Sequence, residues 1–246
     1  MTHLGVVCVH GLGGTPHSVM PLTTAVHAAG YAVVAPHLPG HGTVPSDLAE
    51  CTWNDWMQAV LDTVDELSRR CSDGIVVVGQ SMGATLGLLA SVKRSNIRGV
   101  TAINPLVLPP DPDATEHIEY LLARGRTMQP AGDPDLRDLA AHDTAYAEMP
   151  LRSLLALGRG AASANAALPA IDVPVLAVSS DHDSVVDPAN ADMLATTMTT
   201  AGHGPVTRLR LPNSGHVAAL DLDRDLLCRE LLTWLANLTD ASAPAG

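Results

Sequence analysis

The chain has 246 residues, a length typical of one large domain with a fully developed hydrophobic core. Hydrophobic residues make up 46% of the sequence, which excludes a chain that is disordered throughout. The net charge is −12 and no run of Lys or Arg is present, so neither nucleic acid nor an anionic membrane surface is expected as a partner.

Cysteine usage and hydropathy indicate a cytoplasmic protein. The four cysteines are scattered and form no C-x-x-C pair, which argues against a zinc site and against a disulfide framework. The first residues, Met1 to Leu4, lead directly into an apolar run and lack the basic region of a signal peptide. No apolar stretch approaches the ~18 residues of a membrane helix, so stable membrane insertion is not expected. The oligomeric state stays open.

Short apolar runs rich in β-branched residues alternate with longer amphipathic stretches. Continuous apolar runs are typical of strands buried on both faces of a parallel sheet. The predicted strands are Leu4–Val9, Tyr31–Ala35, Ile75–Val78, Gly99–Ile103, Val173–Val178 and Val206–Leu211. The predicted helices cover residues 17–29, 53–70, 82–93, 188–201 and 223–238. Thr52 to Asp55 resembles a capping box, and Gly30 marks a helix end. This alternation predicts an α/β fold with a mostly parallel sheet flanked by helices.

Residues 105–168 break the alternation. They are rich in proline and contain helical patches at Glu116–Arg124 and Leu151–Leu157, but no strand is predicted there. We expect a core of residues 1–104 and 169–238, with 105–168 as a small helical cap over the strand ends, where ligands bind in open α/β sheets. The alternative is an ordinary long crossover. Residues 239–246 are expected to be a flexible tail.

The strongest chemical motif is Gly79-Gln80-Ser81-Met82-Gly83. It follows a predicted strand and opens a predicted helix, the context in which G-x-S-x-G forms a nucleophile elbow. Such a turn is tight, so the positions two before and two after the serine must lack side chains. Ser81 is therefore the predicted nucleophile, at the positive end of a helix where an oxyanion is favoured.

A glycine-rich loop, His10-Gly11-Leu12-Gly13-Gly14, follows the first strand. Gly11 and Gly13 let the backbone approach a substrate closely. In hydrolases the residue after the His-Gly pair donates its N–H to the oxyanion hole, so the Leu12 and Met82 N–H groups are expected to act together. The loop lacks the spacing of a dinucleotide site, and no cofactor is expected.

A serine nucleophile needs a base and a group that orients the base. His216, in the loop after the last predicted strand, has the chain order of hydrolase triads. A surface histidine is the alternative, since the chain has 11 histidines. His37 and His41 have i, i+4 spacing, but Pro39 and Gly40 between them exclude a regular helix, so no metal site is expected.

Three carboxylates follow the strand Val173–Val178. Asp187 precedes Pro188 at a helix start and is interpreted as an N-cap. Asp181 is expected to shape the turn. Asp183 is followed by apolar residues that would anchor its loop, so it is the predicted acid of the triad.

Together these motifs resemble one known family. In chain order they are His10 to Gly14, Gly40-His41-Gly42-Thr43, Trp53-x-x-Trp56, Gly79 to Gly83, Ser180 to Val186 and Asn213 to Val217. The set is similar to the small bacterial carboxylesterases and monoacylglycerol lipases of the α/β-hydrolase superfamily, over nearly the whole chain.

The resemblance implies a serine esterase that needs no cofactor and acts on small-molecule esters of short to medium acyl chains. Leu12 and Gly215 differ from the bulky residues often found at these positions in the family, and both are expected to widen the acyl pocket. Leu121 and Leu154 of the cap are the predicted acyl contacts. Thioesters, lactones, amides and carbamates remain alternative substrates, and a non-catalytic ligand receptor on the same fold is the alternative function.

Overall fold

Six parallel strands form the central sheet, in the order β2-β1-β3-β4-β7-β8. Their bounds are β1 (Gly5–Val9), β2 (Ala32–Val34), β3 (Ile75–Gln80), β4 (Ile97–Ile103), β7 (Val175–Ser180) and β8 (Val206–Leu211). This computed structural model describes residues 3–202 and 204–241. All six strands overlap the stretches predicted from the sequence, and the predicted fold class is confirmed.

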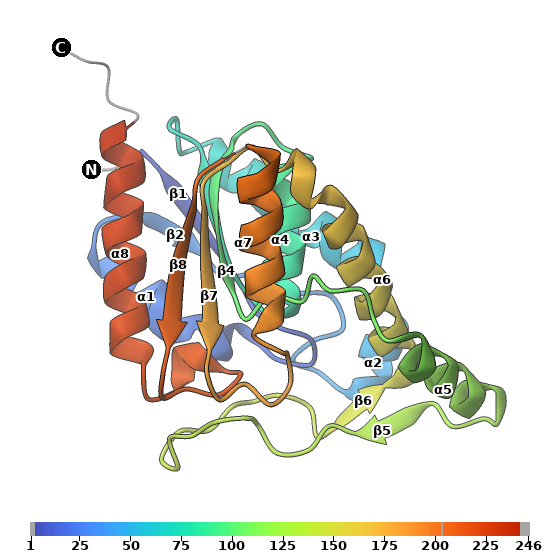
Figure 1. Ribbon diagram of the computed structural model, residues 1–246. Coiled ribbons are helices and arrows are strands. Elements are labelled where there is room, and N and C mark those ends of the chain that lie inside the picture. Colours follow the sequence, from blue (N-terminus) through green and yellow to red (C-terminus); the bar gives the residue numbers. More distant parts are fainter. Residues whose placement is uncertain (1–2, 203, 242–246) are drawn as a thin grey trace.

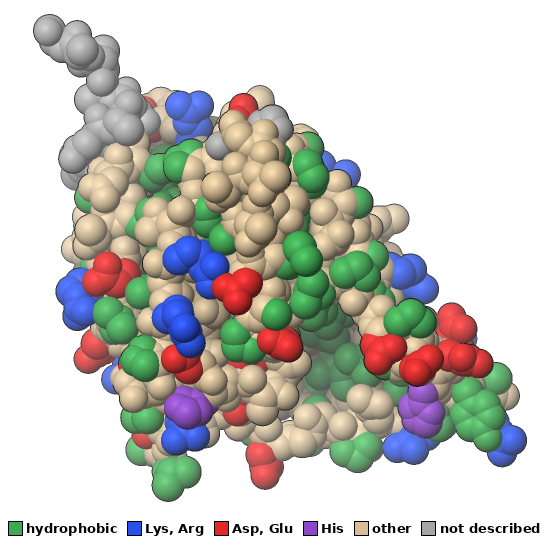
Figure 2. Space-filling model, in the orientation of Figure 1, with side chains coloured by type: hydrophobic (Ala, Val, Ile, Leu, Met, Phe, Trp, Pro, Cys, Tyr) green, Lys and Arg blue, Asp and Glu red, His purple; other side chains and the backbone are tan. Residues whose placement is uncertain are grey.

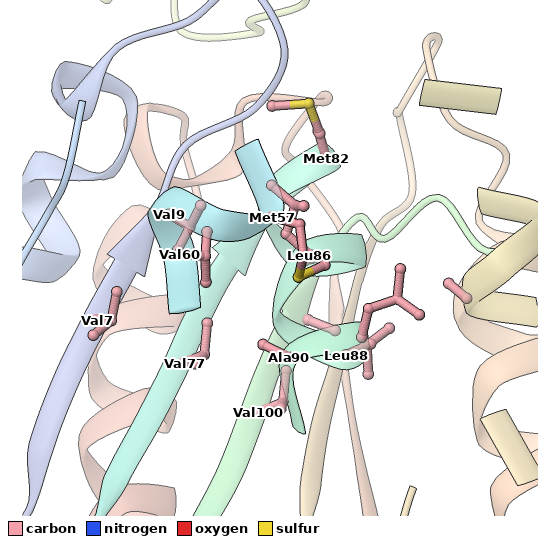
Figure 3. Packing of buried hydrophobic residues seen from close by; sticks show 14 of the residues in the cluster. Val7, Val9, Met57, Val60, Val77, Met82, Leu86, Leu88, Ala90 and Val100 are labelled. Atoms are coloured by element: carbon pink, nitrogen blue, oxygen red, sulfur yellow. The ribbon is translucent and has the colours of Figure 1, made fainter. Parts of the chain in front are cut away.

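Helices cover both faces of the sheet (Figure 1). On one face are α1 (Met20–Ala28) and α8 (Arg224–Ala241), and on the other are α3 (Trp53–Ser68), α4 (Met82–Ser91) and α7 (Ala189–Ala201). Successive strand residues point to opposite layers: Val6 and Cys8 pack toward the first pair of helices, and Val7 and Val9 pack toward the second group. Figure 3 shows this second layer. The central strands β1 and β3 are buried on both faces and are almost entirely apolar, whereas the edge strand β8 exposes Arg208 and Arg210.

The shorter elements connect these layers. They are η1 (Pro16–Val19), α2 (Pro45–Ala49), η2 (Leu168–Ala170) and η3 (Ala218–Leu220). The predicted capping box is confirmed, because the Thr52 hydroxyl accepts from Asp55 N–H while the Asp55 carboxylate accepts from Thr52 N–H. Gly30 follows α1 with a φ of 89°, as a helix-ending glycine does.

The insertion between β4 and β7 contains two strands that the sequence did not predict. Its elements are α5 (Pro112–Ala123), β5 (Met128–Pro130), β6 (Glu148–Pro150) and α6 (Leu151–Ala167), and β5 pairs antiparallel with β6. The expectation that this region has no strand is therefore wrong. Each strand has three residues and ends in proline, which is too short for an alternating pattern and contains a residue that usually argues against a strand.

The helices of the insertion do not lie over the strand ends. Helix α6 packs against α2, α3 and α4, and its Gly160 accommodates the ring of Trp53. Helix α5 packs on α6, and none of its described residues is buried. The segment that passes below the arrowheads of β7 and β8 in Figure 1 is the irregular chain 131–147 between β5 and β6. We call residues 131–147 the cap segment.

The end of the chain differs from the expectation of a flexible tail over 239–246. Helix α8 extends to Ala241, so residues 239–241 are helical, and residues 242–246 lie outside the described part of the chain. Across the described residues, no helix combines the length and the apolar character needed to cross a bilayer.

Candidate active site

Ser81 occupies a sharp turn between β3 and α4. Its φ of 55° and ψ of −119° lie in a region that residues other than glycine rarely adopt. A Cβ on Gly79 would come within 2.2 Å of the Gly83 backbone, and a Cβ on Gly83 would come within 2.2 Å of the Val9 carbonyl oxygen. Both glycines are therefore required by close backbone contacts. Gly79 meets the turn itself, as the motif suggested, and Gly83 meets the end of β1.

The loop after β1 lies beside this turn. An added Cβ on Gly11 would be 3.7 Å from the Ser81 hydroxyl oxygen, so Gly11 is next to the serine and Leu12 follows it directly. Met82 is the first residue of α4, whose positive end faces the same turn. Gly13 is placed differently, because its added Cβ would meet the Met149 methyl at 2.5 Å and its carbonyl accepts from Tyr146 N–H at 3.0 Å. Gly13 thus contacts the cap segment and β6.

His10 supports the glycine-rich loop through two hydrogen bonds. Its Nδ1 donates to the Gly11 carbonyl at 2.9 Å, and its Nε2 accepts from Leu38 N–H at 3.2 Å. These two partners define the tautomer of a neutral imidazole. Complete burial lowers the pKa of His10 to about 3, so the ring carries no charge at neutral pH.

His216 and Asp183 form a hydrogen-bonded pair. The imidazole Nδ1 donates to Asp183 Oδ2 at 2.8 Å, and the Asp183 side chain is only 1% exposed. Asp183 Oδ1 accepts from Val185 N–H at 2.9 Å and from Val186 N–H at 2.8 Å. The carboxylate is thereby fixed by its own loop, and the second oxygen is left for the histidine.

The other two aspartates of this loop have different partners. Asp181 accepts from the Arg210 guanidinium at 2.7 Å, so it forms an ion pair in addition to lying in the turn. Asp187 Oδ1 accepts from Ala189 N–H at 2.8 Å, in the manner of a capping residue. Helix α7 begins at Ala189 with Pro188 as its N-cap, one residue later than predicted. Of the three carboxylates, Asp183 is the one that contacts His216.

Two amides hold the backbone of His216, and sequence reasoning missed both. Gln80 Nε2 donates to the His216 carbonyl at 2.6 Å, and Asn104 Nδ2 donates to the same oxygen at 2.9 Å. Asn104 also bonds Ser180 at the end of β7 and has a φ of 45°. Gln80 directly precedes Ser81, so this bond links the His216 backbone to the turn of the serine. The available sequence signal was the place of Gln80, at the variable position directly before the serine of the G-x-S-x-G motif.

The cap segment supplies further contacts that the sequence did not reveal. The Tyr146 hydroxyl donates to the Gly40 carbonyl at 2.9 Å and accepts from Thr43 N–H at 2.8 Å. An added Cβ on Gly215 would meet the Asp135 carbonyl oxygen at 2.7 Å. The space at Gly215 is therefore filled by the cap segment, and the expectation that this glycine widens an acyl pocket is wrong.

Asp143 of the cap segment lies near three histidines. Burial raises the pKa of the Asp143 carboxyl, while the Thr144 N–H bond and the nearby His17, His216 and His142 act in the opposite direction. An acidic group that no sequence pattern indicated is thus present close to the His216 side of the site.

The two predicted acyl contacts are in different surroundings. Leu154 packs against the core cluster that contains Met82 and Met149, whereas Leu121 lies on α5 at the outer margin of the molecule (Figure 1). A cavity of about 760 Å³ between α2, α5 and α6 is lined by Leu122 and Leu155. Neither Ser81 nor His216 lines this cavity.

Within residues 3–202 and 204–241, no group of three or more His, Cys, Asp or Glu side chains is arranged to hold a metal ion. His41 Nδ1 donates to the Pro39 carbonyl at 3.0 Å, and the ring packs against His10 and Trp56. His41 is therefore part of the packing around His10.

Comparison with known proteins gives consistent results. The model of the alpha/beta hydrolase family matches residues 6–230. A thermostable monoacylglycerol lipase of Bacillus sp. (strain H-257) is 37% identical over 95% of this chain and 91% of its own length. A carboxylesterase of Bacillus subtilis (strain 168) is 24% identical over 95% of this chain and 92% of its own. A solved structure from work on LipS and LipT, two metagenome-derived lipolytic enzymes, has a TM-score of 0.89 and 29% identity, over 96% of this chain and 94% of that chain.

Proposed function

Because this chain belongs to the alpha/beta hydrolase family, we propose that it hydrolyses carboxylic esters through an acyl-enzyme on Ser81. The observation that carries the proposal is the bonding of His216. Its ring donates to Asp183 at 2.8 Å, and its carbonyl accepts at 2.6 Å from Gln80, the residue next to Ser81. The base, its orienting acid and the strained serine therefore belong to one bonded unit at the carboxyl edge of the sheet.

The proposed reaction begins with proton transfer. His216 Nε2 accepts the Ser81 hydroxyl proton while Oγ forms a bond to the ester carbonyl carbon. The Leu12 and Met82 N–H groups stabilise the negative oxygen of the tetrahedral intermediate, and the positive end of α4 adds to this stabilisation. His216 then returns the proton to the leaving alkoxide. Water, activated by the same histidine, cleaves the acyl-enzyme in the second half of the reaction.

The role of Asp183 follows from its bonds. A carboxylate that accepts from Nδ1 keeps Nε2 unprotonated and stabilises the imidazolium that forms during proton transfer. Because Val185 N–H and Val186 N–H occupy Oδ1, the carboxylate cannot rotate away without losing two hydrogen bonds. The base is thus preorganised before the substrate arrives.

The substrates we propose are esters of short to medium acyl chains, including monoacylglycerols. Two relatives support this choice, one named a monoacylglycerol lipase and one a carboxylesterase. Figure 2 shows a hollow between α7 and the elements α5 and α6, with hydrophobic side chains along it. An acyl chain buried between the insertion 105–168 and the core, near Leu154 of α6, gains about 0.8 kcal/mol per methylene until the space is full. The four free cysteines support our placement of the enzyme in the reducing cytoplasm.

The test is a screen over p-nitrophenyl esters of graded chain length, with monoacylglycerols, thioesters and amides in parallel. We expect ester turnover, and we expect Ser81→Ala to lower kcat by about 10⁴ to 10⁶ while the melting temperature stays near that of the wild type. A fluorophosphonate probe should label the wild type and leave Ser81→Ala unlabelled. Turnover of more than a few per cent in the folded variant would exclude Ser81 as the nucleophile.

A further inference from the structure

One carboxylate of the cap segment bonds both loops of the proposed acid–base pair. Asp135 Oδ2 accepts from Ser184 N–H at 2.8 Å and from His216 N–H at 3.0 Å. Ser184 directly follows the proposed acid, and His216 is the proposed base. A single oxygen atom therefore joins the loop after β7 to the loop after β8.

The backbone of Asp135 contributes to the same junction. Its carbonyl accepts from Val217 N–H at 3.3 Å, on the far side of His216. An added Cβ on Gly215 would lie 2.7 Å from that carbonyl oxygen and 2.9 Å from Oδ1, so only glycine allows this approach. Residues 215, 216 and 217 thus each contact Asp135.

A second carboxylate fixes the cap segment in this position. Asp221 is 1% exposed and accepts from Arg137 N–H at 3.0 Å and from Asp138 N–H at 2.7 Å. The same carboxylate accepts from Gly215 N–H at 2.7 Å. The cap segment and the loop of the base therefore share a buried anchor, which holds Asp135 against both loops.

From these contacts we infer that Asp135 is a positioning residue that aligns His216 with Asp183 and Ser81. This inference rests on the proposed function. The two loops leave different strands, so the bond between His216 and Asp183 depends on how the loops are held relative to each other. Removing the Asp135 carboxylate leaves two N–H groups without their shared acceptor and frees the loops to separate. A displacement of about 1 Å in a reacting group lowers the rate by up to about 10²-fold.

The experiment compares three variants with the wild type on a p-nitrophenyl ester. Asp135→Ala removes the acceptor. Asp135→Asn removes the charge but keeps an amide oxygen that can accept from both N–H groups. Asp133→Ala is the matched control, since Asp133 is an exposed acid two residues earlier in the same segment. Thermal unfolding is measured for each, and Asp135→Ser, whose side chain is too short to bridge the loops, replaces the alanine variant if that variant fails to fold.

We expect Asp135→Ala to lower kcat by about 10- to 100-fold with KM nearly unchanged. Asp135→Asn should recover most of kcat, and Asp133→Ala should match the wild type. A loss confined to KM, a wild-type kcat in Asp135→Ala, or an equal loss in the alanine and asparagine variants would each overturn the inference. An inactive wild type that the fluorophosphonate probe does not label would overturn the proposed function itself.

Discussion

Ser81 and His216, the proposed nucleophile and base, are held in place in different ways. On the serine side, the turn is fixed by close packing of neighbouring residues, with glycines at 79 and 83 where any side chain would collide with backbone atoms at 2.2 Å. On the histidine side, hydrogen bonds arrive from Gln80, Asn104 and Asp135, and each donor or acceptor is at least 81 positions away in the chain.

This difference determines whether a substitution lowers the stability of the protein or its kcat. A steric clash in the turn raises the free energy of the folded state, because backbone atoms cannot move aside cheaply. A single hydrogen bond lost from the loop of His216 leaves its other hydrogen bonds in place, so the fold is kept and the position of the side chain changes. Substitutions of the glycines beside Ser81 should therefore act mainly on stability, and substitutions of the residues that hold His216 should act mainly on kcat.

The largest effect that we predict on the histidine side is that of Asp183→Asn. The new amide N–H₂ cannot accept from Nδ1, so the imidazole is stabilised in the tautomer with its proton on Nε2, where it cannot act as a base. We expect kcat to fall by about 10⁴-fold, measured by initial rates on a p-nitrophenyl ester. The melting temperature should change little.

The matched control is Asp181→Asn, on the same loop. Asp181 pairs with Arg210, whose side chain is 70% exposed, and exposed ion pairs contribute at most about 1 kcal/mol to stability. Its kcat should stay near that of the wild type. A severe loss at Asp181 with near-normal turnover at Asp183 would reverse the assignment of the acid.

On the serine side, Gly83→Ala tests the steric explanation. The added methyl would be 2.2 Å from the Val9 carbonyl oxygen and 2.8 Å from that of His10, both backbone atoms. We expect the free energy of unfolding to fall by more than about 4 kcal/mol, measured by urea denaturation. Gly30→Ala is the control, because its φ of 89° is unfavourable but no atom lies within 4 Å of the added methyl. It should cost about 1 kcal/mol.

The same contrast explains what the sequence predicted. The motif at Ser81 contains both positions, Gly79 and Gly83, where a side chain would collide with backbone atoms, so five consecutive residues were enough to predict the turn. The backbone that Gly83 meets nevertheless belongs to Val9 and His10, far away in the chain. The central strands were predictable because burial on both faces leaves continuous apolar runs. Asp183 was selected over two neighbours by the residues that follow it, and the structure places Asp183 within hydrogen-bonding distance of His216.

The supports of His216 were not predictable in this way. Asp135 and Asp221 are single acidic residues in loops, and no local pattern distinguishes them from solvent-exposed aspartates. Their roles depend on a chain path that brings residue 135 beside residue 216, which is a tertiary property. The strands β5 and β6 escaped prediction for a related reason, since three-residue strands ending in proline are determined by their pairing rather than by their composition.

The loop that carries Leu12 is held by one local and one distant hydrogen bond, because His10 bonds its neighbour Gly11 and also Leu38. This predicts a pH dependence of stability. Burial is the main cause that lowers the pKa of His10 from 6.5 to about 3. As the pH falls below 6.5, the unfolded chain binds a proton at this residue that the folded chain does not bind. Stability therefore decreases as the pH falls from about 6.5 to about 3, and does not change further from this source below that.

At pH 5 the loss due to His10 is about 2 kcal/mol relative to pH 8. His10→Asn keeps a donor for the Gly11 carbonyl but cannot titrate, so it should be less stable than the wild type at pH 8 and lose about 2 kcal/mol less on going to pH 5. Urea denaturation at the two pH values measures both quantities, and His27→Asn, at an exposed histidine of α1, should leave the wild-type difference unchanged. Equal losses in the wild type and His10→Asn would mean that the His10 ring is protonated in the folded protein at pH 5. The loop of Leu12 would then not depend on a neutral imidazole that accepts from the distant Leu38 N–H.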